Sequence, residues 1–90
     1  MEYEKLIHAI IDPIVENKDA VLIRELAGAT DEDVDILIAA DKEDTSRLIG
    51  RKGTIANAIR EIVSIGGKKD NKHIHIRFES FDDDGENKED

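Results

Sequence analysis

The segment from Leu48 to Ile55 reads Leu-Ile-Gly-Arg-Lys-Gly-Thr-Ile and combines two glycines with two cations. Glycine permits backbone angles and close approaches that a Cβ atom would block. Because Gly53 is expected to begin a helix, the unpaired amides and the positive dipole end of its first turn face whatever lies against the loop. Arg51 and Lys52 add full positive charges beside those amides. The loop is therefore suited to holding a phosphodiester backbone.

Other side-chain chemistry has little support in the sequence. The chain has no cysteine, which excludes a disulfide framework, a thiolate nucleophile and a cysteine-ligated zinc. The loop lacks the spacing of a Walker phosphate-binding motif, and no nucleophile has a neighbouring base. His73 and His75 are expected about 6.6 Å apart along one strand, but no third metal ligand is evident. We expect no enzyme activity, no metal and no cofactor.

Apolar spacing predicts the elements that precede the loop. Residues 3–16 carry an apolar stripe at intervals of three and four, which is typical of an amphipathic helix. Pro13 interrupts the stripe, so we expect a kink or a helix end near Asp12 followed by a turn. Residues 20–26 are rich in β-branched side chains and predict a first strand. The second strand is predicted where Val34, Ile36 and Ile38 alternate with Asp35, Leu37 and Ala39.

Two helices and a third strand are predicted around and after the loop. Asp41 is expected to cap a short helix that runs through Leu48. A second amphipathic helix is expected over residues 54–65, stopped by Gly66-Gly67 and followed by a polar loop at residues 68–72. The third strand is predicted where Ile74, Ile76 and Phe78 alternate with His73, His75, Arg77 and Glu79.

The predicted element order is αββααβ, which indicates an α+β domain. A helical crossover between the second and third strands favours a parallel pair, and a short loop between the first two favours an antiparallel hairpin. We expect a mixed three-stranded sheet with three helices on one face, in one domain at residues 1–79. Residues 80–90 form an acidic tail with too few apolar side chains to fold, so we expect it to be disordered.

The net charge of −9 taken whole argues against a polyanionic ligand. The charges are segregated, however, because residues 1–46 sum to −9, residues 47–77 to +6 and residues 78–90 to −6. Solvated faces of a small domain could give the same segregation, so the spacing of residues has to decide. The glycine loop lies inside the basic block. Only three aromatic residues occur, which leaves little for a base-stacking platform.

The loop and its frame resemble the KH domain, whose Ile-Gly-x-x-Gly loop lies between two helices. The extra helix and strand at the N-terminus resemble the prokaryotic type II arrangement, and length and order are similar to the small bacterial single-KH proteins of the KhpA (YlqC) group over about residues 3–79. A bare Gly-x-x-Gly is common by chance, so the flanking residues and the βααβ frame carry the resemblance. Two alternatives are an ordinary helix connection with a glycine cap, and a degenerate KH domain that pairs only with proteins.

The resemblance implies that the chain clamps about four nucleotides of single-stranded RNA in a narrow groove. It further implies a post-transcriptional regulator or RNA chaperone linked to cell elongation and division. The chain departs from the group at Thr54 and Asn57, where basic residues are common, so we expect weak intrinsic affinity. The RNA-binding residues implied are Arg47, Leu48, Ile49, Gly50, Arg51, Lys52, Gly53, Thr54, Ile55, Asn57 and Arg60.

A second function implied by the resemblance is a dimerisation or adaptor module. Its partners would be a second copy of the chain, giving a homodimer, or a larger Jag/KhpB-like KH protein, giving a heterodimer. The chain begins without a secretory signal pattern and has no long apolar run, so we expect a cytoplasmic protein that does not enter a membrane. We also expect the acidic tail to compete with RNA for the basic block.

Overall fold

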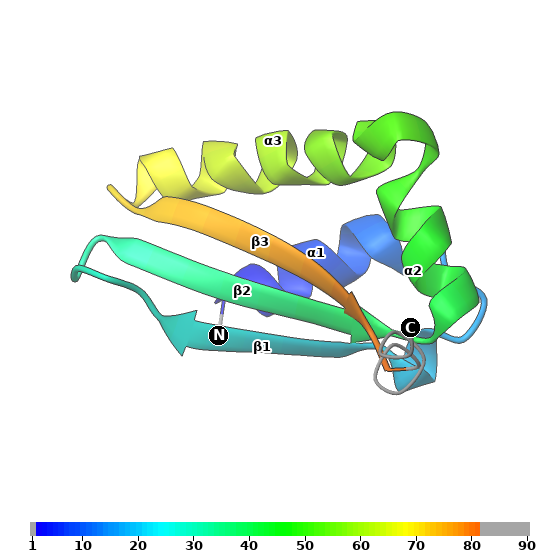
Figure 1. The fold of residues 1–90 in the computed structure, drawn as a ribbon. Coiled ribbons are helices and arrows are strands. Elements are labelled where there is room, and N and C mark those ends of the chain that lie inside the picture. Colours follow the sequence, from blue (N-terminus) through cyan, green and yellow to red (C-terminus); the bar gives the residue numbers. More distant parts are fainter. Residues whose placement is uncertain (1, 82–90) are drawn as a thin grey trace.

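Three α-helices, two short 3-10 helices and a mixed three-stranded sheet make up residues 2–81, the part of the chain that the computed structural model describes (Figure 1). The predicted α+β class and the order αββααβ are both confirmed. The elements are α1 (Glu2–Ile11), η1 (Lys18–Ala20), β1 (Leu22–Ala27), β2 (Asp33–Ala40), α2 (Lys42–Ile49), η2 (Arg51–Gly53), α3 (Thr54–Lys69) and β3 (His73–Ser80).

The sheet has the strand order β1-β2-β3, with β2 in the centre. Strands β1 and β2 pair antiparallel with Ile23 opposite Ile38, and β2 and β3 pair parallel with Ile36 opposite Ile76. The crossover through α2 and α3 makes the second pair parallel, as predicted. Strand β3 is consequently an edge strand, and its outer edge faces α3 (Figure 1).

Helix α1 ends at Ile11, which confirms the predicted helix end near Asp12 and not the alternative of a kink at Pro13. The Ile14 amide donates to the Ile11 carbonyl at 2.8 Å, which forms the turn expected after the helix. The first strand begins later than predicted, because the Ala20 amide donates to Asn17 in a 3-10 turn and β1 starts only at Leu22.

The core lies between the sheet and the helices. Alternation along β2 turns Val34, Ile36 and Ile38 towards the helices, where each is at most 6% exposed. Helix α1 contributes Ile7 and Ile11 to the same cluster, and the other members are Val15, Ile23, Ala40, Leu48, Ile59, Val63 and Ile76. Each large aliphatic side chain buried here stabilises the fold by about 1.5–3 kcal/mol. The aliphatic cluster therefore fixes how α3 lies against β3.

Helix α3 does not stop at Gly66-Gly67, and that prediction is wrong. The helix runs to Lys69, so Lys68 and Lys69 belong to the helix and the loop before β3 is shorter than predicted. The carbonyl of Gly67 accepts from the amides of Asp70 at 2.9 Å and Lys72 at 2.7 Å, which ends the helix two residues later. Gly67 itself is buried against β3, where a Cβ atom would lie 2.5 Å from Cγ1 of Ile74. It serves close packing and does not break the helix.

The two neighbouring glycines predict opposite effects of alanine. In Gly66→Ala the new Cβ meets only Leu6 Cδ2 at 3.7 Å, an ordinary contact, so we expect a gain of roughly 0.5–1 kcal/mol from the better helix former. In Gly67→Ala the clash with Ile74 and the Lys72 carbonyl is expected to cost about 1–3 kcal/mol. Urea unfolding of both variants checks the signs; a stabilised Gly67→Ala protein contradicts the packing role.

The predicted boundary between domain and tail falls inside β3. Ser80 is the last residue of that strand, and the Phe81 amide donates to the Ala40 carbonyl at 2.9 Å. The rest of the predicted disordered tail, residues 82–90, lies outside the described residues.

Candidate nucleic-acid interface

Helix α2 carries the chain into the loop. The Asp41 carboxylate accepts from the Asp44 amide at 2.8 Å, which confirms the predicted N-cap. At the other end, the Gly50 amide donates to the Ser46 carbonyl at 2.9 Å, and Gly50 adopts φ 74° and ψ 178°. A Cβ atom on Gly50 would lie 2.4 Å from Cγ1 of Ile55. Only glycine fits at this turn.

The loop itself is a tight turn with an uncommon backbone. The Gly53 amide donates to the Gly50 carbonyl at 3.2 Å, and Lys52 takes a left-handed conformation with φ 58° and ψ 24°. That conformation costs roughly 1–2 kcal/mol for a residue with a side chain, and such strain is concentrated at functional sites. The side chains of Arg51 and Lys52 are exposed. The turn therefore presents two adjacent cations to solvent.

Helix α3 starts directly after this turn. Gly53 is its N-cap and provides no side-chain hydrogen bond, and Thr54 is the exposed first residue of the helix. The amides of the first helical turn consequently receive no side-chain cap, and the dipole of this 16-residue helix places partial positive charge there. Amides, dipole and two cations together favour an anion such as a backbone phosphate.

The four apolar residues predicted to line the groove divide into two pairs. Leu48 and Ile59 are each 1% exposed and belong to the core beneath the loop. Ile49 and Ile55 are each 37% exposed and flank the loop on the surface. Only the second pair is accessible to a ligand.

Arg47 lies in the last turn of α2 and forms ion pairs with two carboxylates. Its Nη1 donates to Asp44 Oδ1 at 2.6 Å, and its Nη2 lies 3.5 Å from Glu16 Oε2. The Asp44 pairing raises the pKa of Arg47 further. Two acids thus already neutralise this cation, which the sequence had grouped with the loop.

Asp44 has a structural role in positioning α2, and it was not identified from the sequence. Its side chain is buried and accepts from the amides of Glu16 at 2.9 Å and Asn17 at 3.0 Å, besides Arg47. The Glu16 amide, then the Asn17 amide and Arg47, hold the pKa of this carboxyl below its ordinary value against the opposing effect of burial. The carboxylate ties the segment after α1 to the helix that carries the loop.

Arg60 and Asn57 lie together on the side of α3 that faces β3. The Arg60 Nη1 donates to Asn57 Oδ1 at 3.1 Å, and its Nε donates to the Ile76 carbonyl at 3.2 Å. The guanidinium carbon also lies 5.4 Å from the centre of the Phe78 ring. The spacing of three residues along a helix could have suggested the first contact. The contacts to β3 had no signal in the sequence.

Shallow hollows continue from Arg60 along the junction of α3 and β3. One is lined by Arg60, Glu61, Ser64, Ile65 and Lys68, and the next shares Ser64 and Lys68 and adds Lys72, His73 and Ile74. Lys72 donates from Nζ to the Asp31 carbonyl at 2.9 Å, whereas the Lys68 side chain forms no hydrogen bond or ion pair within residues 2–81. A shallow groove with basic side chains therefore extends from Arg60, in the middle of α3, towards the end of the helix.

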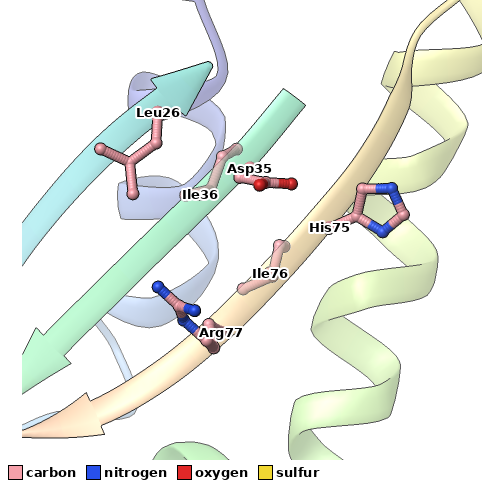
Figure 2. A pocket seen from close by; sticks show the side chains of 6 residues that line it. All are labelled: Leu26, Asp35, Ile36, His75, Ile76 and Arg77. Carbon is pink, nitrogen blue, oxygen red and sulfur yellow. The ribbon is translucent and has the colours of Figure 1, made fainter. Parts of the chain in front are cut away.

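Figure 2 shows the face of the sheet opposite to the one on which the described helices pack. A hollow there is lined by Leu26, Asp35, Ile36, His75, Ile76 and Arg77, with Asp35 and His75 on adjacent strands. His75 Nε2 also lies 3.6 Å from Asp33 Oδ1, and the pKa of Asp33 is lowered by Thr30 first and then by His75 and His73, against partial desolvation. The alternation of β3 keeps Phe78 off this face. The described strands thus place no aromatic ring here on which a base could stack.

Within residues 2–81, no three His, Cys, Asp or Glu side chains are grouped so that they could hold a metal ion. None of the helices in this part of the chain is both long and apolar enough to cross a membrane.

Element order, mixed sheet and a glycine loop between α2 and α3 define a KH domain of type II. A family model described as "KhpA/KhpB, KH domain" matches residues 4–78, and the chain belongs to this family. It is not a family of enzymes, as the sequence predicted.

Curated relatives agree with the family match. RNA-binding protein KhpA of Listeria monocytogenes is 37% identical over 75 residues, which cover 83% of this chain and 96% of the relative. RNA-binding protein KhpA of Bacillus subtilis is 35% identical over 79 residues, covering 88% and 93%. The protein of that name from Streptococcus pneumoniae is 40% identical over 60 residues, covering 67% and 73%. No solved structure gave a significant match.

Proposed function

We propose that this protein binds single-stranded RNA and holds its backbone at the loop Gly50-Arg51-Lys52-Gly53. The observation that carries the proposal is the pair of exposed cations on a tight turn at the uncapped start of α3. The relatives named as RNA-binding proteins support it. A single strand suits the site, because specific recognition of RNA mostly uses unpaired bases and KH loops clamp about four backbone nucleotides.

The proposed contacts differ in kind along the chain. Gly50 and Gly53 let a phosphate approach the loop backbone closely, Thr54 begins helix α3 beside them, and Arg51 and Lys52 supply charge. Ile49 and Ile55 offer exposed apolar surface to sugars or bases beside the loop. Arg47 is committed to Asp44 and Glu16, so we expect it to support the fold and not the ligand.

We further propose that the protein acts in the cytoplasm as a regulator or chaperone of RNA, because such a role needs binding and no chemistry. The proposal includes a link of this role to cell elongation and division. Ultraviolet crosslinking in cells tests it. The wild-type chain is expected to crosslink to RNA, and the variant with Asp at positions 51 and 52 is not. Equal crosslinking of the two proteins contradicts the proposed site.

A second function, self-association, is favoured by an exposed isoleucine stripe on α3. Ile62 is 45% exposed and Ile65 is 68% exposed, and Ile55 continues the same line towards the loop. Isoleucines repeated on one helix surface suit a symmetric contact with the same helix of a second copy, or with a KhpB-like KH partner.

We expect the double change Ile62→Glu and Ile65→Glu to abolish dimers, because it would place acidic groups in an apolar contact. Sedimentation at several concentrations measures the change, and Leu22→Glu with Leu26→Glu, two exposed leucines of β1, is the matched control. A wild-type chain that stays monomeric at every concentration removes this second function.

A further inference from the structure

The outer edge of β3 lies beside α3, and some of its backbone hydrogen-bonding groups point away from β2. An edge strand presents unpaired N–H and C=O groups, and alternate residues direct them to opposite sides. The His73 amide donates to Glu32 at 2.7 Å on the β2 side, whereas the Ile76 carbonyl accepts from Arg60 of α3. The Ile76 carbonyl therefore points away from β2 and towards Arg60, which lines the groove along α3.

Arg60 covers this carbonyl and is fixed from three directions. The Ile76 carbonyl accepts from its Nε, Asn57 Oδ1 accepts from its Nη1, and the Phe78 ring lies under its guanidinium group. A planar guanidinium held in this way has little freedom left, so its remaining N–H groups have a defined direction. The side chain as a whole is still exposed. It is a preorganised group at the surface of the groove.

The anchoring changes what the groove can recognise. Arg60 Nε already uses one of the two lone pairs of the Ile76 carbonyl, so this acceptor is less available to an amino group of adenine or cytosine. The guanidinium supplies donors only, because arginine has no acceptor. A base edge that carries two adjacent acceptors fits it, and the O6 and N7 atoms of guanine form the commonest bidentate partner of arginine. The free side of the guanidinium plane can also stack on a base.

We propose that Arg60 determines the base preference of the groove and makes it select guanine in single-stranded RNA. This rests on the proposed RNA-binding function and adds the chemistry of one base position to it. Arg60 is a specificity residue in this scheme, whereas Arg51 and Lys52 hold the backbone regardless of sequence.

Selection from a randomised pool of ten-nucleotide single-stranded RNAs tests the proposal with four proteins. Wild type is expected to enrich guanine at one position, roughly tenfold over the other bases. Arg60→Ala is expected to lose that enrichment and to gain adenine and cytosine, because the Ile76 carbonyl becomes more available to amino groups. Arg60→Lys keeps the charge without the planar fork, so guanine enrichment is expected to fall while the dependence of affinity on salt stays the same.

The fourth protein, Arg51→Asp with Lys52→Asp, distinguishes backbone binding at the loop from base selection by Arg60. If wild type retains the pool and this variant does not, RNA binding at the loop stands, and the base profiles decide the role of Arg60. An unchanged base profile in Arg60→Ala, with a uniform loss of affinity, overturns the specificity role and makes Arg60 a phosphate contact. A wild-type protein that retains no RNA overturns both proposals.

Discussion

Replacing Arg51 and Lys52 with aspartate is expected to raise the Kd for single-stranded RNA about a hundredfold or more. A hydrogen bond to a charged group contributes roughly 1.5–3 kcal/mol, and two are lost here, while the new carboxylates repel phosphate. Fluorescence anisotropy with a labelled RNA measures the change. The slope of log K against log salt should also decrease by about 0.7 for each phosphate contact removed.

The same variant should fold normally. Both side chains are exposed, and neither forms an ion pair or side-chain hydrogen bond within residues 2–81. Circular dichroism and the melting temperature are therefore expected to match wild type. A melting temperature several degrees lower would mean that the charges support the turn itself.

A matched control separates the loop from the bulk charge of the protein. Lys5→Asp with Lys18→Asp changes the net charge by the same amount at two exposed lysines on α1 and η1. Because the chain already carries −9, long-range repulsion should weaken binding only slightly, most at low salt. Equal weakening by both double variants would contradict a localised phosphate site.

The elements that carry the loop could be predicted because each has a local cause. Pro13 cannot continue a helix, Asp41 offers a carboxylate to free amides, and alternation along residues 34–38 assigns one face of β2 to the core. The parallel pairing of β2 and β3 then follows from the crossover rule. None of these inferences needs knowledge of what lies across the molecule.

Gly67 shows where such local reasoning ends. Glycine is a poor helix former, so the pair at 66–67 predicted a stop. Packing against Ile74 overrides that preference, because β3 can approach the helix closely only where no Cβ is present. The cause is the packing of the following strand against the helix, which helix propensity cannot reveal.

The candidate site also has a part that could be predicted from local sequence and a part that could not. The loop cations and glycines were evident from their types and spacing, and the structure places them on one exposed turn. The partners of Arg47 and Arg60 were not evident, because Glu16 and the Ile76 carbonyl approach them only through the fold. A backbone carbonyl has no signature in a sequence at all. Charge counting therefore overstated the cations available to a polyanion.

Asp44→Asn is expected to lower the melting temperature by several degrees relative to wild type. The buried carboxylate accepts from two amides and a guanidinium, and an asparagine would turn an NH2 group towards one of these donors. Asp41→Asn on the same helix is the matched control, because asparagine caps a helix about as well as aspartate. We expect little change from the control. Equal losses in the two variants would contradict the role of Asp44 as the tie between α1 and α2.

The pH dependence of this difference identifies the carboxylate as its source. The pKa of Asp44 is lowered in the folded protein, so the unfolded chain takes up the proton first as pH falls below about 3.9. The stabilisation is complete above that pH and is lost as pH falls through the folded pKa. The gap in unfolding free energy between wild type and Asp44→Asn should therefore be constant near neutrality and shrink below about pH 4. Asp33, whose pKa is also lowered, is present in both proteins and cancels from the comparison. A gap that persists unchanged into strong acid would show that packing, and not charge, holds α2 against the end of α1.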